Sequence, residues 1–230
     1  MKNELINLIK VNRISTVEVS DALGKKGVLE NIFPLNNGLF SVGEVQYVST
    51  WNKSNFQLHK QIQNVNKNCI LFIDAINCNE FAVLGDLVAK SMILYNEVNA
   101  IVVDGLVRDA HRLRKENYPI WSKGTTPLGC FNKEEKITKE IIKHIEKRKK
   151  IFDKSIIVAD DSGCTLIKKN EFKLLFDKLK FIELQEDIWY FCIDVLKMTT
   201  FETICEKEYL KNPNLLPNNL RNKLHNYLNK

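Results

Sequence analysis

The sequence lacks most features that mark specialised protein classes. Nine of its 230 residues are Gly and five are Pro, which excludes collagen-like and Pro/Gly-rich disordered chains. Its six Cys are scattered without a C-x-x-C pair, which favours reduced core thiols over a disulfide framework or a zinc site. The longest stretch without Lys, Arg, Asp or Glu, residues 31–43, is too short to span a bilayer.

Common catalytic signatures are also absent. The chain contains no GxGxxG, no GxxxxGK followed by Ser or Thr, no HExxH and no GxSxG. Dinucleotide, P-loop, zinc-protease and serine-hydrolase interpretations therefore lose most of their support. Residues 1–10 are amphipathic and charged, without an apolar signal core, so we expect a cytoplasmic protein with no membrane partner.

The net charge of +6 is concentrated in one segment. Residues 133–150 hold eight Lys or Arg against four Glu. Such a run can contact nucleic acid. No aromatic residues for base stacking are interleaved within it, so we prefer a solvated helix face and consider a nucleic-acid partner improbable.

Hydrophobic periodicity predicts an α/β fold with a mostly buried sheet. Strands are expected at 39–50, 69–74, 100–104 and 119–122, alternating with helices at 56–62, 82–96 and 110–116. A hairpin is expected at 156–167 around the turn 160–163. Helices are also expected at 1–12, at 16–23 and from residue 171. We place the α/β domain at 1–205 and a helical tail at 206–230.

Two short loops carry the side chains with chemical potential. In the first, Gly85 and Asp86 open a helix whose free N–H groups can hold a carboxylate, although Asp86 can equally serve only to cap that helix. In the second, Arg108 and Asp109 follow an apolar strand. Arg108 can bind a carboxylate and Asp109 a hard cation, but the two also suit a local surface ion pair.

Taken together, the loops belong to a series of motifs that resembles the RraA-like family. This family includes 4-hydroxy-4-methyl-2-oxoglutarate aldolases, oxaloacetate decarboxylases and the regulator of ribonuclease activity A. The similar stretches, in the family's order, are 16–23 (T-x-x-V-x-D-A-L), 55–59 (N-x-x-L-H), 84–87 (G-D/E-L), 102–109 (V-V-D-G-x-V-R-D), 119–127 (P-V-F/W-x-x-G-x-x-P) and 157–163 (V-V-A-D-x-D-G). Each motif alone is weak, but six in order are fairly specific.

The resemblance implies a swivelling β/β/α-type layered domain with peripheral N- and C-terminal helices, assembled as homotrimers or homohexamers. In catalytic members Asp109 would bind the divalent metal, Mg²⁺ or Mn²⁺, and Asp86 would contact it through water. Arg108 and the backbone amides of the Gly85–Leu87 loop would hold a 2-oxo-acid. His59, or a water at the metal, would move the proton.

The implied function is that of a metal-dependent lyase that cleaves a C–C bond of a small 2-oxo-acid by retro-aldol reaction or decarboxylation and releases pyruvate. Retention of Asp109 after Arg108 favours this branch over the regulators. The alternative is a non-catalytic RraA-like regulatory or binding protein, possibly one that acts on RNA-processing enzymes.

Three departures from the family pattern accompany the resemblance. The spacing from Asp86 to Arg108 is one residue longer than usual, and an added residue at 95–99 would leave both loops in place. The basic run 133–150 replaces a glycine-rich stretch. An acidic group from a neighbouring subunit has only Glu183 and Glu186 as candidates, by position alone.

Overall fold

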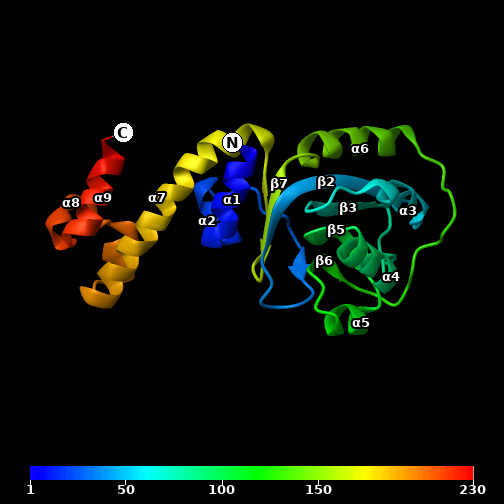
Figure 1. Ribbon diagram of the computed structural model, residues 1–230, viewed down its shortest axis with the longest axis horizontal. Helices are drawn as coiled ribbons and strands as arrows, with labels where there is room; N and C mark the ends of the chain where they lie inside the picture. Colours follow the sequence, from blue (N-terminus) through cyan, green and yellow to red (C-terminus); the bar gives the residue numbers. More distant parts are fainter. Residues whose placement is uncertain (230) are drawn as a thin grey trace. The chain divides into compact units, whose positions relative to one another are not determined.

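The computed structural model describes residues 1–229. The chain divides into two compact units, Met1–Phe172 and a second unit that begins at Lys173 (Figure 1). The sequence placed the end of the first domain at residue 205. The strands, all in the first unit, are β1 (Phe33–Pro34), β2 (Ser41–Trp51), β3 (Ile70–Ile76), β4 (Ala82–Leu84), β5 (Ala100–Val107), β6 (Ile120–Thr125), β7 (Ile156–Asp160) and β8 (Gly163–Ile167).

These strands form one sheet in the order β1-β6-β5-β3-β2-β7-β8, with β4 paired to β5. The pairs of β5 with β3, β4 and β6 are parallel, and so is the pair of β2 with β3. The start of β2 pairs antiparallel with β7, so this long strand joins the parallel and antiparallel parts. The two ends of the path approach each other, since a Cβ added to Gly163 beside β8 would lie 3.1 Å from the Ile32 carbonyl oxygen beside β1. The sheet is therefore nearly closed and barrel-like, and the predicted α/β class is confirmed.

Alternation along the strands divides the core into two parts. On β3, Leu71 and Ile73 join one buried cluster, while Ile70 and Phe72 join the other. Successive strand side chains point to opposite faces, so each apolar run supplies both clusters. The first cluster includes residues of α3, α4 and α5, and the second includes residues of α6. Both faces of the central strands are therefore covered.

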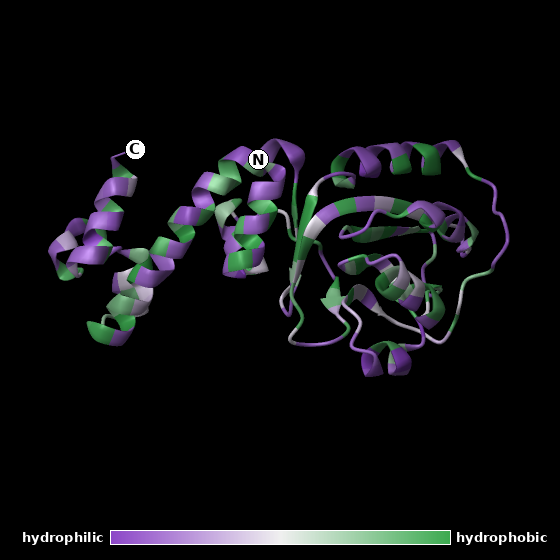
Figure 2. Cartoon of the chain, in the orientation of Figure 1, coloured by the Kyte–Doolittle hydropathy of each residue, from purple (hydrophilic) through white to green (hydrophobic). Residues whose placement is uncertain are grey.

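Helices of the first unit surround this sheet. They are α1 (Lys2–Asn12), α2 (Thr16–Ala22), α3 (Phe56–Gln61), α4 (Asp86–Lys90), α5 (Ala110–Lys115) and α6 (Lys139–Phe152). Ser15 and Glu18 form a capping box at the start of α2. Figure 2 shows α6 with polar residues on one side and apolar residues on the other, which is consistent with buried Ile141 and Phe152.

One expected helix is partly wrong. The sequence predicted helix over 82–96, but Ala82–Leu84 is strand β4, and α4 begins only at Asp86. A three-residue strand shows no periodicity of its own, and its pairing with β5 is a tertiary contact that the local pattern cannot reveal. After α4 the chain continues as a π-helical turn, η2 (Ser91–Tyr95).

The second unit is helical. Its helices are α7 (Phe172–Tyr190), α8 (Glu208–Lys211) and α9 (Asn218–Leu228). Leu184 and Ile188 of α7 share a buried cluster with Tyr209, Leu220 and Leu224. Because α7 takes part in this separate core, the compact unit begins near residue 173. No helix within residues 1–229 combines the length and apolar character needed to cross a membrane.

Candidate active site at the ends of β4 and β5

Parallel pairing brings the two predicted loops together. Leu84 at the end of β4 is a register partner of Val107 on β5, and the Arg108 N–H donates to the Leu84 carbonyl at 2.9 Å. Gly85–Asp86 and Arg108–Asp109 therefore leave neighbouring strands at the same edge. The wider π turn at Ser91–Tyr95 lies beyond α4, where an added residue leaves this geometry undisturbed.

Asp109 sits at the centre of the arrangement. Its backbone is left-handed (φ 58°, ψ 31°) and precedes α5, a conformation that Asp tolerates better than most residues. Its Oδ2 accepts a hydrogen bond from the Asp86 N–H at 3.1 Å and lies 3.6 Å from the Arg108 Nε. A Cβ added to Gly85 would lie only 2.5 Å from this oxygen. Gly85 is thus needed for the close approach of the two loops.

Arg108 is confined by a second glycine. A Cβ added to Gly129 would overlap the Arg108 Nη1 and lie 3.1 Å from its Cζ. Gly129 is held in place because the Ala82 N–H donates to the Leu128 carbonyl and the Cys130 N–H donates to the Ala82 carbonyl. One side of the guanidinium therefore lies directly against the Gly129 backbone, while the Arg108 side chain remains half exposed.

Asp86 is paired with a residue that the sequence did not single out. The Arg112 Nη1 lies 2.8 Å from the Asp86 Oδ2. This hydrogen bond from Arg112 is the main reason why the pKa of Asp86 lies below its ordinary value. Asp86 is therefore a carboxylate at neutral pH.

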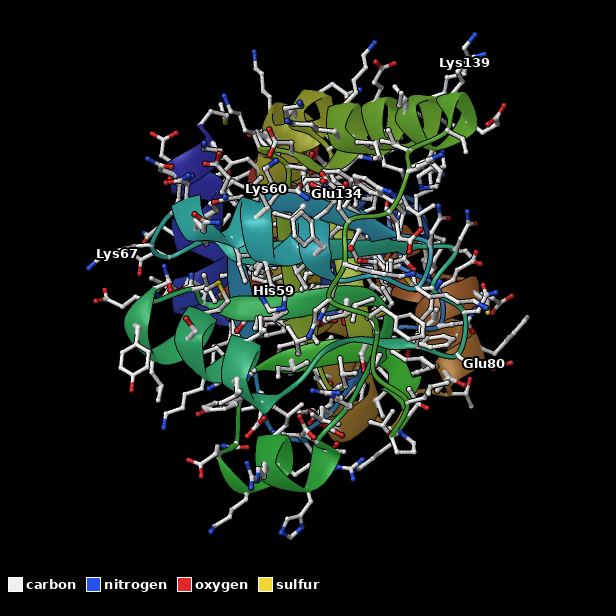
Figure 3. All side chains as sticks on the ribbon, turned by 90° about the vertical axis from the view of Figure 1, so that its right-hand side faces the viewer. His59, Lys60, Lys67, Glu80, Glu134 and Lys139 are labelled. Atoms are coloured by element: carbon white, nitrogen blue, oxygen red, sulfur yellow. The ribbon has the colours of Figure 1, made fainter. Side chains whose placement is uncertain are left out.

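The Gly85–Leu87 loop, Arg108 and Asp109 line one cavity of about 180 Å³. Its lining includes every candidate site residue, His59 and Leu87 among them, and is formed by Asn55, His59, Ala82, Val83, Leu84, Gly85, Asp86, Leu87, Val88, Arg108, Asp109, Cys130 and Asn132. Figure 3 shows His59 and its neighbour Lys60 leaving α3 on different sides. The structure thus brings together all six predicted site residues.

Asn55 was missed as a site residue, although it begins the motif that contains His59. Its Oδ1 is buried and has no hydrogen-bond partner. A buried amide oxygen without a partner is unfavourable, and in a cavity lining it marks a place where a ligand or ion can supply the missing contact. Cys130 and Asn132 also line the cavity, and no pattern in the sequence pointed to them.

The oxygen donors of the cavity suit a hard divalent cation. Mg²⁺ typically binds one or two carboxylates and keeps several waters, which fits Asp86, Asp109 and the unpartnered Asn55 Oδ1. Within residues 1–229 no group of three or more His, Cys, Asp or Glu is arranged to hold a metal ion. The donor set is therefore compatible with Mg²⁺ or Mn²⁺ and unsuited to a structural zinc ion.

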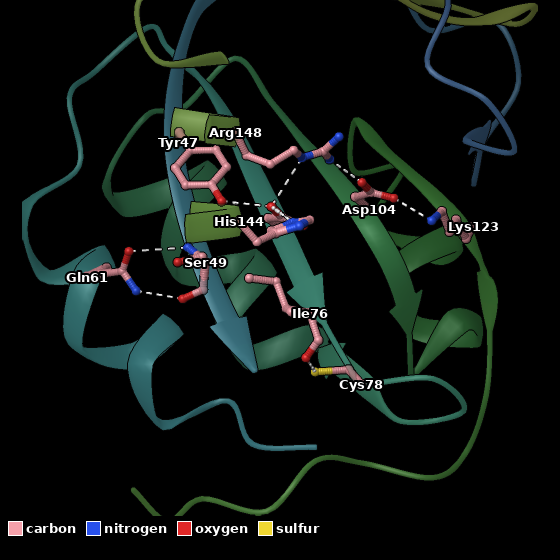
Figure 4. A network of polar contacts seen from close by, with 10 residues as sticks. Tyr47, Ser49, Gln61, Ile76, Cys78, Asp104, Lys123, His144 and Arg148 are labelled. Atoms are coloured by element: carbon pink, nitrogen blue, oxygen red, sulfur yellow. Dashed lines mark hydrogen bonds and ion pairs between the residues drawn. The ribbon is translucent and has the colours of Figure 1, made fainter. Parts of the chain in front are cut away.

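A second carboxylate cluster lies on the α6 side of the sheet. Asp74 and Asp104 are register partners on β3 and β5, and Arg148 of α6 bonds to both. The Asp74 Oδ2 also accepts a hydrogen bond from the Tyr47 hydroxyl at 2.7 Å and lies 3.1 Å from the His144 Nε2 (Figure 4). Lys123 pairs with Asp104. The basic run was predicted to be a solvated helix face. That prediction is incomplete, because Arg148 and His144 of α6 contact the carboxylates of the sheet.

A larger cavity of about 740 Å³ lies near the start of β2, away from both loops. Its lining is rich in Asn and Lys residues, among them Lys10, Lys149 and Asn99. It offers no arrangement of carboxylates and a guanidinium comparable to that at Asp109, so size alone does not identify the active site.

Sequence comparisons identify relatives of this chain. The chain is 29% identical over 192 residues to protein DlpA of Legionella pneumophila, covering 81% of this chain but only 31% of that protein. It is 28% identical over 181 residues to a protein of Halalkalibacterium halodurans named "Putative 4-hydroxy-4-methyl-2-oxoglutarate aldolase", covering 77% and 83% of the two chains.

Solved structures show the same fold at lower identity. An uncharacterised Pseudomonas syringae protein aligns with a TM-score of 0.66 and 22% identity, over 87% of this chain and 96% of that one. Streptomyces coelicolor RraAS2, described as an unusual member of the RNase ES inhibitor RraA protein family, aligns with a TM-score of 0.63 and 22% identity, over 80% and 94%. The family described as "RraA-like: Aldolase/RraA" matches residues 16–166, so the chain belongs to the RraA-like family.

Proposed function

We propose that the protein is a divalent-metal-dependent lyase that cleaves a C–C bond of a small 2-oxo-acid and releases pyruvate or a related 2-oxo-acid. The observation that carries this proposal is the convergence of Arg108, Asp86 and Asp109 on one small cavity. The relationship to the Halalkalibacterium halodurans protein supports the same class of reaction. The fold alone would not support a particular reaction, since one fold serves many functions.

Arg108 and the first turn of α4 would hold the substrate. The planar guanidinium binds a carboxylate through two parallel hydrogen bonds, and one side of it lies against Gly129. The first N–H groups of a helix have no partner within that helix. At α4 the Asp86 N–H donates to the Asp109 Oδ2 and the Leu87 N–H bonds the Asp86 carboxylate, so a substrate oxygen would have to share or replace these contacts. Donors fixed before the reaction stabilise charge that develops as the bond breaks.

Asp109 and Asp86 would hold Mg²⁺ or Mn²⁺, which as a Lewis acid would withdraw negative charge from the oxo group of the substrate. His59 lies in the lining of the same cavity and can take or give a proton there. Arg112 keeps Asp86 in place at the rim. We further propose that the enzyme acts in the cytoplasm as a homotrimer or homohexamer, which sedimentation equilibrium tests.

An assay of pyruvate release tests the lyase proposal. Purified protein is incubated with oxaloacetate or 4-hydroxy-4-methyl-2-oxoglutarate, with Mg²⁺, Mn²⁺ or EDTA, and pyruvate is measured by a coupled reaction. The metal alone serves as the control for spontaneous decarboxylation. We expect turnover that EDTA removes, together with Mn²⁺ binding that Asp109→Asn abolishes and that Asp187→Asn, at an exposed carboxylate of α7, leaves intact.

Absence of both turnover and metal binding would contradict the proposal. It would favour the alternative of a non-catalytic RraA-like regulatory or binding protein.

A further inference from the structure

Arg112 stands at the rim of the cavity without being part of its lining. It is the third residue of α5, and its side chain is 73% exposed. Its described partner is the Asp86 carboxylate, 2.8 Å away, and Asp86 does line the cavity. One ion pair thus places a mobile guanidinium within one side chain's reach of the site.

The cavity is short of positive charge for a substrate with two carboxylates. Among the lining residues, Arg108 is the one with a permanent positive charge, and His59 is a weaker candidate. If Arg108 and the metal hold the 2-oxo-acid end, a second carboxylate needs another cation. Arg114, on the same helix, donates to the Leu35 carbonyl at 3.4 Å, and His111 is exposed. Arg112 is the arginine of this helix that reaches a cavity residue.

Arg112 and a divalent cation would compete for the same carboxylate. Both are positive, and both would be drawn to the Asp86 oxygens, so binding of the cation weakens the Arg112–Asp86 pair. An exposed ion pair is worth little, so its loss costs little. The released guanidinium then has its five donors free at the mouth of the cavity.

We propose that Arg112 is a specificity residue: it pairs with Asp86 in the empty site and transfers to the second carboxylate of a 2-oxo-dicarboxylate when a divalent cation binds Asp86. This inference rests on the proposed lyase function. Arg112 would favour 2-oxo-acids that carry a second negative charge beyond the bond that breaks.

The two candidate reactions use that carboxylate differently. In retro-aldol cleavage of a 4-hydroxy-2-oxo-dicarboxylate, the C4 hydroxyl loses its proton and the C3–C4 bond breaks. The electron pair of that bond forms the pyruvate enolate, which takes up a proton at C3, while C4 becomes the ketone of a second 2-oxo-acid. The distal carboxylate keeps its charge throughout, so Arg112 can hold it from substrate to product.

In decarboxylation of oxaloacetate the same carboxylate departs as CO₂ and loses its charge. A guanidinium on that group stabilises the substrate more than the transition state. Arg112 should therefore lower KM and kcat together for oxaloacetate and leave kcat/KM nearly unchanged, whereas it should raise kcat/KM for the aldol substrate. This difference between the two substrates is a readout that a purely structural role of Arg112 would not produce.

Arg112→Ala tests the inference, with Arg114→Ala as the matched control on the same helix and Arg112→Lys as the conservative variant. For Arg112→Ala we expect about a tenfold loss of kcat/KM with 4-hydroxy-4-methyl-2-oxoglutarate. With oxaloacetate KM and kcat should rise together, so that kcat/KM changes by less than about twofold. The inhibition constant of 2-oxobutyrate, which matches oxaloacetate but lacks the second carboxylate, should stay unchanged. Arg112→Lys should restore part of the loss.

Metal binding provides a readout independent of turnover. Removing the competing guanidinium should tighten Mn²⁺ binding about two- to fivefold in Arg112→Ala and leave it unchanged in Arg114→Ala. If Arg112→Ala and Arg114→Ala behave alike towards both substrates and Mn²⁺ while the wild-type protein is active, the inference is overturned and the lyase function stands. If the wild-type protein neither binds Mn²⁺ nor releases pyruvate, the proposed function fails as well.

Discussion

One pair of carboxylates lies within the parallel strands β3 and β5, and another lies in the loops that follow β4 and β5; the two pairs have different surroundings. Asp74 and Asp104, under α6, are bonded by Arg148 and further contacted by Tyr47, His144 and Lys123. Asp86 and Asp109, on the loops, share one hydrogen bond and are paired only with the exposed guanidiniums of Arg112 and Arg108.

Burial accompanies the difference. Asp74 is 4% exposed, and the Arg148 guanidinium above it also stacks on the Phe152 ring at 4.4 Å. Burial and the Asp74 charge both raise the pKa of Tyr47, so its hydroxyl remains a donor. The loop carboxylates adjoin a cavity with an unpartnered amide oxygen instead. The Asp74–Asp104 pair thus forms an internal brace, because side chains of the protein satisfy its charges. The Asp86–Asp109 pair adjoins a cavity and forms a candidate ligand site.

The largest expected effect is a loss of activity when a carboxylate of the Asp86–Asp109 pair is neutralised. Asp109→Asn keeps a residue that tolerates the left-handed backbone but removes the charge that would hold the cation. We expect kcat/KM for pyruvate release to fall about a thousandfold, with the free energy of unfolding changed by less than about 1 kcal/mol. Steady-state kinetics and urea unfolding measure the two quantities. Equal turnover in the variant would remove Asp109 from the proposed metal site.

Asp74→Asn should show the reverse. The neutral amide leaves the partly buried Arg148 with one carboxylate partner, Asp104, instead of two, and Tyr47 with a weaker acceptor. We expect the free energy of unfolding to drop by about 3 kcal/mol. Urea denaturation gives this value, with the exposed Asp187→Asn as control. A variant as stable as the parent would show that the network under α6 is not a brace.

Gly129→Ala should disturb the open site alone. The added methyl group displaces the flexible end of Arg108 rather than backbone, so the fold can adapt while the guanidinium moves. We expect KM for the 2-oxo-acid to rise about tenfold, with a stability change below about 1 kcal/mol. Kinetics of Gly129→Ala are compared with those of the wild-type protein and of Asp187→Asn, an exposed position outside the cavity lining. Unchanged KM would show that Arg108 does not need this contact.

The smallest effect concerns the Asp86–Arg112 pair and its dependence on pH. Arg112 keeps the pKa of Asp86 below its ordinary value of 3.8, so the unfolded chain takes up the proton first as pH falls. The pair's contribution is therefore complete above that value and disappears as pH falls through the lower folded pKa. Arg112→Ala should lower the free energy of unfolding slightly at pH 7 and not at all in strong acid. Urea unfolding at both pH values decides, and a cost that persists in acid would indicate lost packing instead.

The sequence predicted the frame of the molecule well. Alternation located β2, apolar runs located β3 and β5, and the Gly163 turn located the β7–β8 hairpin. The family resemblance joined the Asp86 and Arg108 loops in one site. The structure places these loops side by side through the β4–β5 pairing, and the roles of the residues remain predictions.

Other parts of the site depend on tertiary contacts that local patterns do not encode. The three residues of β4 show no alternation, and the Gly129 loop approaches Arg108 from a distant segment. Arg148 and His144 belong to a charged run in which the sequence does not show which side chains face the sheet and which face solvent. Only the packing of α6 reveals that these two contact Asp74. Asn55 could have been found, because it lies four residues before His59 in the same motif.

The π turn at Ser91–Tyr95 has a consequence for comparing this protein with others. It stores one more residue than an α-helical turn would, at a place where neither strand register nor loop direction depends on it. Related chains can therefore differ in length between β4 and β5 and still superpose at Gly85 and Arg108. Searches that demand a fixed gap between the two motifs will overlook such relatives, whereas searches that allow the gap to vary will find them.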